Sequence, residues 1–188
     1  ILSKNYRLTK DLDLEGVEFS GIGSGTAPFT GIFDGQGHTV SNVSIKREAE
    51  NTGFFNVIKG ATIKNLNLEN AEITGTTNVG GLVGWAQVQL DQENIAKNIA
   101  NLIGSCTVTG TVNGETKVGG LVGVNDGDED PDTLFSIASS IDKSSFSGTV
   151  TGEYQAGGLV GLNDGTITKG SATGSVQSAD GKTIGQGL

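Results

Sequence analysis

The chain has 188 residues, of which 31 are glycine, and its 21 acidic and 12 basic side chains give a net charge of -9 at pH 7. A negative chain with scattered Lys and Arg repels phosphate backbones, which excludes nucleic acid as a partner. The glycines follow no three-residue period and apolar residues recur regularly, which excludes collagen and disorder. No apolar run approaches the ~18 residues of a bilayer-spanning helix, so membrane insertion is not expected.

A single domain is expected over residues 1–188, with residues 1–50 as its opening or capping region. The polar stretch Tyr6–Gly16 is predicted to form the cap or the first coil. His38 follows Phe33–Gly37, and this segment resembles the opening turns of β-helices that cleave polysaccharides. Glycosidic cleavage needs two positioned carboxylates or a carboxylate with a base, and Asp34 is the only acid in this turn. Hydrogen bonds of Asp34 and His38 are therefore expected to stabilise a turn.

Residues 51–188 contain an internal repeat, which is the strongest signal in the sequence. The segment GGLVG occurs at Gly80–Gly84, Gly119–Gly123 and Gly157–Gly161. Asn51–Phe55 and Thr183–Leu188 look like degenerate copies, which predicts that the chain ends inside a repeat and that the repeats continue in a longer parent. The core repeat is about 28 residues. Two units carry insertions directly after GGLVG, at Trp85–Asn101 and Asn125–Phe135, and both insertions should project from a corresponding corner.

Upstream of each GGLVG, apolar or small residues alternate with polar ones, as in a strand with one buried face. Repeated short strands without an obligatory helix predict an all-β, right-handed parallel β-helix, in which equivalent residues of successive coils form internal ladders. Leu82, Leu121, Leu159 and Phe54 should point inward. A β-propeller is the alternative, but its blades need ~40 residues, more than the shortest repeats here. Cys106, the only cysteine, falls in the alternation and should be a buried thiol.

The first insertion contains two features of interest. Its apolar residues Ile95, Ile99, Leu102 and Ile103 have helical spacing after Asp91, which predicts a short helix that ends by Ala100. Trp85, the only tryptophan, stands where the other copies have Val124 and Leu162, and it should be a ladder member. The alternative is that an exposed Trp85 beside Tyr154 stacks on a sugar ring, as in many glycan-binding surfaces.

The second insertion is acidic. Four aspartates stand at alternate positions in it and offer oxygen ligands that suit Ca²⁺; they are Asp126, Asp128, Asp130 and Asp132. The segment departs from an EF-hand loop, because Pro131 and Ile137 replace the glycine and the glutamate of that motif. A solvated acidic loop is the favoured interpretation, and calcium is the only candidate cofactor.

The repeated GGLVG resembles the GLUG motif, which recurs in bacterial surface proteins, including adhesin-like proteins and non-catalytic regions of IgA1-protease-type metallopeptidases. Three further segments resemble the opening of such β-helices, namely Tyr6–Leu14, Phe29–Ile45 and Gly60–Leu68. The resemblance implies a secreted or surface-exposed setting. It leaves function open, because this repeat serves as stalk, spacer or binding surface in different parents.

The sequence therefore predicts a non-catalytic interaction or spacer module of a secreted bacterial surface protein. The peptidases of the resemblance carry a zinc-binding HExxH, which this sequence lacks, so no catalytic residue is assigned. Expected partners are adjacent domains of the same chain and a host glycoprotein or glycan. A polysaccharide-acting enzyme on the same fold is the alternative, and two acids facing one groove would favour it.

Overall fold

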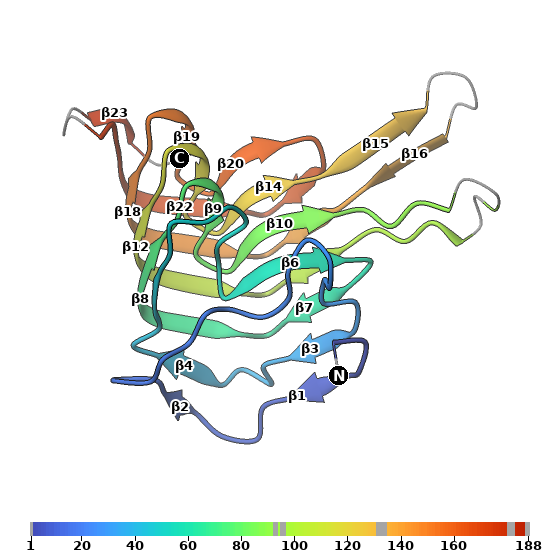
Figure 1. Cartoon of the computed structure of the whole chain (residues 1–188), viewed down its shortest axis with the longest axis horizontal. Helices are drawn as coiled ribbons and strands as arrows, with labels where there is room; N and C mark the ends of the chain where they lie inside the picture. Colours follow the sequence, from blue (N-terminus) through green and yellow to red (C-terminus); the bar gives the residue numbers. More distant parts are fainter. Residues whose placement is uncertain (1, 92–93, 95–96, 131–134, 180–182, 187–188) are drawn as a thin grey trace.

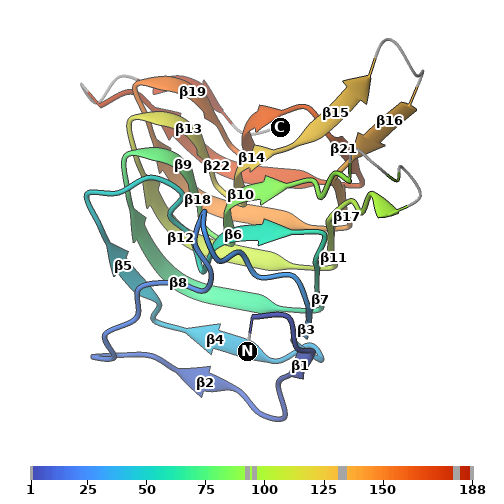
Figure 2. The same ribbon diagram turned by 45° about the vertical axis from the view of Figure 1, so that its right-hand side comes forward.

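The computed structural model describes residues 2–91, 94, 97–130, 135–179 and 183–186. This part of the chain contains 23 β-strands and no α-helix. Four sheets, here named A to D, stack their strands in parallel, and each coil passes through sheets C, A, B and D in turn (Figures 1 and 2). The prediction of a parallel β-helix is confirmed, and pairing between coils rather than within a blade excludes a propeller.

Each sheet is built from short strands of successive coils; sheets A and B have strands from more coils than sheets C and D, and one coil gives sheet B two strands. Sheet A contains β1 (Tyr6–Arg7), β3 (Ile32–Asp34), β7 (Thr62–Lys64), β11 (Leu102–Gly104), β17 (Ser140–Asp142) and β21 (Thr166–Thr168). Sheet B contains β2 (Leu12–Asp13), β4 (Thr39–Ser41), β5 (Ser44–Lys46), β8 (Asn67–Thr74), β12 (Thr107–Asn113), β18 (Ser145–Thr151), β22 (Ser171–Gln177) and β23 (Thr183–Gln186). Sheet C contains β6 (Phe55–Lys59), β10 (Val83–Gln87), β14 (Val122–Asn125) and β20 (Val160–Asn163). Sheet D contains β9 (Thr77–Gly80), β13 (Thr116–Gly119) and β19 (Tyr154–Gly157).

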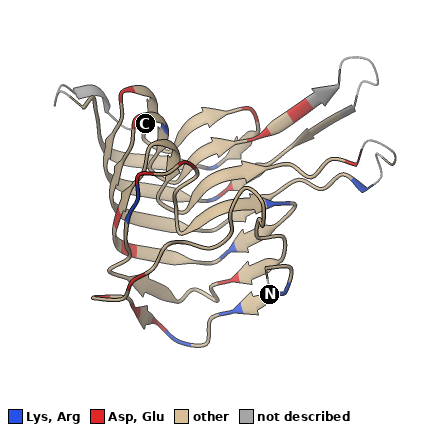
Figure 3. Ribbon diagram, viewed as in Figure 1, with Lys and Arg blue, Asp and Glu red and all other residues tan. Residues whose placement is uncertain are grey.

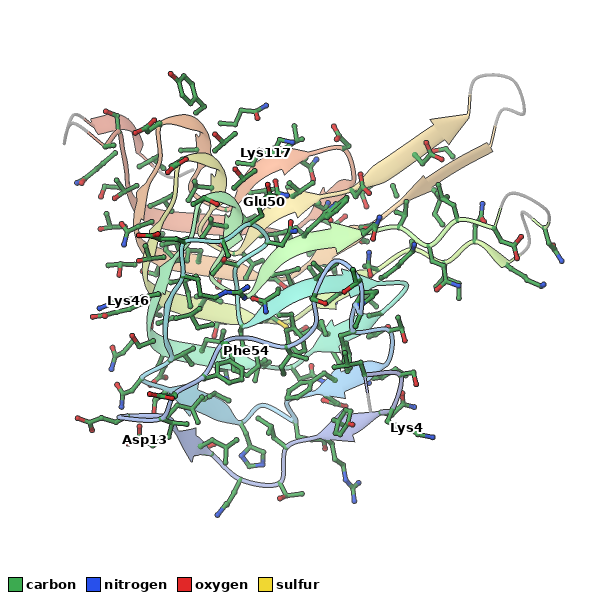
Figure 4. The ribbon with its side chains drawn as sticks, viewed as in Figure 1. Lys4, Asp13, Lys46, Glu50, Phe54 and Lys117 are labelled. Atoms are coloured by element: carbon green, nitrogen blue, oxygen red, sulfur yellow. The ribbon has the colours of Figure 1, made fainter. Side chains whose placement is uncertain are left out.

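The interior is filled by ladders of equivalent apolar residues. Ile63, Ile103, Ile141 and Ile167 pair in register through sheet A, and the first three are fully buried. Leu82 and Leu121 are also fully buried, Phe54 is 5% exposed, and Leu159 is partly buried against the same core, which confirms their predicted inward position. Figure 4 shows Phe54 inside the stack. The alternation read from the sequence therefore sets which face of each strand is buried.

The N-terminal stretch is a coil of the stack. Strands β1 and β2 pair in parallel with β3 and β4, so Tyr6–Gly16 supplies the first strands of sheets A and B. The segment Asn51–Phe55 is in register with the first GGLVG, since Phe55 pairs with Val83, 28 residues later. Strand β23, in the segment predicted as the last degenerate copy, pairs antiparallel with β22, whereas the strands of the other copies pair in parallel.

Stacked asparagines line two of the corners between sheets. The Asn65 amide donates to Asp34 Oδ1 at 3.0 Å, and the Asn78 amide donates to Asn51 Oδ1 at 2.7 Å. Asn51, Asn65 and Asn78 all have φ between 52° and 56°, the left-handed region that asparagine tolerates best among residues with a side chain. Asparagine at these positions therefore stabilises both the turn and the contact between coils.

The asparagine ladder in sheet D stops at Lys117, and this gives a stability prediction. Lys117 lies one coil beyond Asn78 with φ 56°, and Asn78 Oδ1 is buried without a hydrogen-bond partner among the described residues. Lys117→Asn should raise the free energy of unfolding by about 1 kcal/mol, because its amide would donate to Asn78 Oδ1 and asparagine suits this φ. Urea denaturation would measure the change. Lys117→Ala supplies no donor and should show no gain; an equal gain would contradict the ladder explanation.

Asp34 makes the fold sensitive to acid. Its side chain is 16% exposed, and the backbone N–H of Gln36, then the Asn65 amide and Lys64 Nζ, lower the pKa of its carboxyl from 3.8 to about 2. Because folding lowers this pKa, the ionised Asp34 carboxylate stabilises the folded state. Its contribution is complete above pH ~4 and is lost as the pH falls toward 2. Asp34→Asn should therefore cost about 1–2 kcal/mol at pH 7 and much less at pH 2. Urea titrations at both values test this, and a loss independent of pH would contradict it.

Candidate functional site

Both insertions project side by side from the corner between sheets C and A, as predicted (Figure 1). The lower arm, residues 88–100, is closed at its base by two backbone hydrogen bonds of 2.9 Å between Gln89 and Ile99. The upper arm is a hairpin of β15 (Gly127–Asp130) and β16 (Phe135–Ala138). The predicted helix before Ala100 falls largely outside the described residues. Of those described, Lys97 donates its backbone N–H to the Asn94 carbonyl at 2.9 Å in a 3₁₀ turn, and Ile99 lies in an antiparallel bridge with Gln89.

A buried polar network fixes the two arms to the body. The Asn101 amide donates to Ser139 Oγ at 2.9 Å and to the Gln87 carbonyl at 2.8 Å, while Asn101 Oδ1 accepts the Ala61 N–H at 3.0 Å. The Asn125 amide donates to the Ser139 carbonyl at 3.3 Å and to Asn163 Oδ1 at 2.8 Å. Asn101, Ser139 and Asn125 are all almost completely buried. The network therefore joins the start of the upper arm to the ends of both arms.

Sequence reasoning did not find this network. Asn101 and Ser139 stand at equivalent positions, at the end of an insertion and directly before a strand of sheet A. That equivalence was the only sign in the sequence that the two side chains could meet. Their pairing depends on how two coils of different length are superposed. Hydrogen bonds between residues 38 positions apart leave no local pattern in the chain.

Trp85 lies at the base of the arms in sheet C. It is in register with Val57 and Val124, and Val124 with Leu162, as a ladder member should be. None of these four belongs to the main core cluster formed by the described residues, and Trp85 is partly buried. Tyr154 begins β19 in sheet D and is 67% exposed. The two proposed sugar-stacking residues therefore lie in different sheets, and the structure does not pair them.

Asp126 adjoins Trp85 and carries a perturbed carboxyl group. Burial raises its pKa, and the neighbouring charge of Asp164 raises it further; hydrogen bonds from the Val88 and Gly127 backbone and from the Trp85 indole partly oppose this. Asp126 and Asp164 directly follow Asn125 and Asn163, which pair in register, so the two acids lie on adjacent coils. An indole and two carboxyl groups at one corner can bind a polar ligand with an apolar face, such as a sugar.

The other predicted calcium ligands extend along the upper arm. Asp128 pairs with Ile137, and Asp130 pairs with Phe135 nearer the tip, while Asp132 lies outside the described residues. Alternate residues of a strand share one face at a spacing of about 6.6 Å. Figure 3 shows acidic residues along the described part of this arm. Within the described ranges, no three acidic, histidine or cysteine side chains form a cluster suited to a metal ion. The calcium site stays a prediction.

His38 is placed as a structural residue. Its Nδ1 lies 3.0 Å from Asp11 Oδ1 of the first coil, and the same oxygen accepts the Thr39 N–H at 3.0 Å. Those contacts lower the pKa of Asp11, the backbone bond most. Asp34 accepts the Gln36 N–H at 2.9 Å, so both residues stabilise turns, although the partner of His38 is Asp11 rather than a residue of its own turn.

Cys106 is fully buried, and its backbone N–H donates to Ser144 Oγ at 3.1 Å. Burial raises the pKa of the Cys106 thiol to about 12. A thiol with this pKa is protonated at neutral pH and acts as a small hydrophobic residue, as the sequence predicts. The described part of the chain also contains no helix with the length and apolar character needed to cross a bilayer.

The GLUG motif matches residues 114–151 and 152–177. Halomucin from Haloquadratum walsbyi is 39% identical over 97 residues, which is 50% of this chain and 1% of halomucin. The crystal structure of an immunoglobulin A1 protease-like protein from Bacteroides ovatus superposes with a TM-score of 0.68 at 20% identity, over 93% of this chain and 61% of that one. This likeness shows the fold alone, and the chain spans less than two thirds of either protein. Residues 114–177 thus match the GLUG motif, and they lie in a parallel β-helix.

Proposed function

We propose that this chain is a non-catalytic recognition module of a secreted surface protein, and that it binds a glycan or glycoprotein at the corner from which the arms project. One observation carries the proposal. Two insertions from successive coils emerge together, and a buried network anchors both beside Trp85. A passive spacer needs only the coil stack, whereas anchoring two long insertions beside an aromatic residue serves a binding surface.

The comparisons support the setting of this proposal. The match to the GLUG motif and the match to halomucin favour a secreted or surface location. Within that setting the module would be a substrate-recognition region or an adhesin, and the likeness to an immunoglobulin A1 protease-like protein supports the β-helix fold of such a region. The partner is then a host glycoprotein, held by stacking of a sugar on the Trp85 indole and by hydrogen bonds to the neighbouring carboxyl groups.

Surface interferometry with purified mucin and immunoglobulin A, each intact and enzymatically deglycosylated, tests the proposal. Trp85→Leu preserves an apolar ladder residue, since Leu162 occupies the equivalent position, and it should weaken saturable binding about tenfold. Tyr154→Ser is the matched control, because Tyr154 lies in another sheet, and this variant should bind as tightly as the unsubstituted chain. If the folded chain binds neither protein in a saturable way, it is a spacer and the proposal is wrong.

Calcium in the upper arm is part of the same test. The predicted Ca²⁺ would order this arm and would be held by Asp126, Asp128, Asp130 and Asp132. In that case EDTA should weaken binding of the glycoprotein, and added Ca²⁺ should restore it. Asp128→Asn should reduce the response to Ca²⁺. Binding that is unchanged by EDTA would leave a solvated acidic arm as the correct interpretation.

Polysaccharide cleavage is the second candidate function, and the Asp126 and Asp164 pair favours it. Retaining glycosidases use two carboxyl groups about 5–5.5 Å apart, one with a raised pKa as general acid, and burial raises the pKa of Asp126. Release of reducing ends from polysaccharides, abolished in Asp126→Asn and Asp164→Asn, would establish this function. Absence of release at enzyme concentrations that saturate binding would reject it.

A further inference from the structure

We propose that Asn42 is a site of N-linked glycosylation, on the edge of the β-helix opposite the arms. Asn42-Val43-Ser44 is the only Asn-x-Ser/Thr segment in the sequence, and this segment is the acceptor pattern for an N-linked glycan. The inference rests on the proposed secretion of the chain, because the transfer takes place during export. It does not depend on what the arms bind.

The acceptor segment lies in a turn between two strands of sheet B. Strand β4 ends at Ser41 and β5 begins at Ser44, and Asn42 between them has φ 58°. Ser44 is exposed, Asn42 is partly buried and Val43 is fully buried. Since an enzyme must read Asn42 and Ser44 in an accessible chain, transfer would occur before Val43 packs into the core. The folded structure must then accommodate the product.

Hydrogen bonding leaves room for a substituent on the amide nitrogen. Asn42 Nδ2 donates to Asp13 Oδ1 at 2.8 Å, and Asn42 Oδ1 accepts the Asn70 amide at 3.4 Å. A primary amide carries two N–H groups, and a glycosylated one keeps one of them. The bond to Asp13 can therefore survive the modification, together with the ladder of Asp13, Asn42 and Asn70.

A surface hollow adjoins the amide. Asn42, Ser44 and Asn70 line it with Glu15, Val43 and Glu72, and its volume is about 440 Å³. The lining is mainly polar, which suits the hydroxyl groups of the first sugar. Figure 4 shows Asp13, the partner of Asn42, at the edge of the stack away from the arms. A glycan here would leave the proposed binding corner uncovered.

The transfer is a substitution at an anomeric carbon. Asn42 Nδ2 forms a bond to C1 of an oligosaccharide carried on a lipid pyrophosphate, the C1–O bond to the pyrophosphate breaks, and one amide proton is lost to a base. The lipid pyrophosphate leaves with the bonding electrons. No oxidant or reductant is needed.

Secretion of the full chain from a eukaryotic cell line, followed by intact-mass and peptide mass analysis before and after peptide N-glycosidase, tests the proposal. One glycan per chain at Asn42 is expected. Asn42→Gln and Ser44→Ala should lose it, whereas Ser44→Thr and the matched control Asn70→Gln should keep it. The glycosylated chain should retain the thermal midpoint of unmodified chain made in a bacterial cytoplasm; the enzymatically deglycosylated chain is not the reference, because peptide N-glycosidase converts Asn42 to Asp and so removes the Nδ2 donor to Asp13.

Two results would overturn the proposal: secretion of folded chain without a glycan, or a glycan that lowers the thermal midpoint and so conflicts with the fold. Binding by Trp85 and the arms is measured on unmodified protein from a bacterial cytoplasm. Failure of that binding and failure of glycosylation are therefore separate outcomes.

Discussion

Gly148→Ala should destabilise the β-helix by about 3 kcal/mol or more, so that the variant unfolds at a much lower urea concentration than the unsubstituted chain. Gly110, Gly148 and Gly174 pair in register across sheet B with φ of 142°, 155° and 120°. A Cβ at residue 148 would overlap the carbonyl oxygen of Gly110 in the coil beneath. Relief would require the strands to separate, which would break the ladder hydrogen bonds on that side.

Urea denaturation followed by circular dichroism measures this loss, and Gly25→Ala is its control. A Cβ at Gly25 would meet no atom within 4 Å, and the φ of Gly25 is outside the strained range, so its substitution should change stability by less than about 0.5 kcal/mol. Equal stability of the two variants would show that coils can separate at residue 148 without cost.

Ile141→Ala should cost about 3 kcal/mol because it opens a cavity inside the stack. Ile141 is fully buried between Ile103 and Ile167 of the adjacent coils, and such a site cannot collapse without moving a whole strand. The same substitution at Ile167 tests the explanation. Ile167 has the same ladder position but is 41% exposed, so its loss should be nearer 1 kcal/mol.

Thermal and urea unfolding of both variants, compared at one temperature, gives the two differences. A ratio near three between Ile141→Ala and Ile167→Ala is expected. Similar losses would mean that coil position does not govern the contribution of ladder residues, and would contradict the packing described above. Native-like circular dichroism of each variant before unfolding is the necessary control.

Much of the fold was predictable because a β-helix repeats its local pattern. Spacing of GGLVG placed Leu82 and Leu121 inside, and alternation placed Val108 and Val112 on the buried face of β12. Each coil meets only its neighbours, so a position that is apolar in one copy is apolar in the next for the same physical reason. Insertions after GGLVG likewise had to leave from equivalent corners.

Local pattern left the pairing of two segments open. In the lower arm, the helical spacing through Ile99 gave no sign of its bridge to Gln89. At the last repeat copy, the glycine spacing gave no sign that β23 pairs antiparallel with β22. Spacing gives periodicity but not the direction in which a strand pairs.

The sequence by itself determined the repeat, the buried face of each strand and the location of both insertions, because these follow from periodicity and turn chemistry within one coil. Only the tertiary structure decided the rest of the candidate site. It joined Asn101, Ser139 and Asn125 in one buried network, set Asp126 beside Trp85, and separated Trp85 from Tyr154. These contacts link residues of different coils or the two ends of one insertion, and the length of the insertions hides their alignment until the coils are stacked.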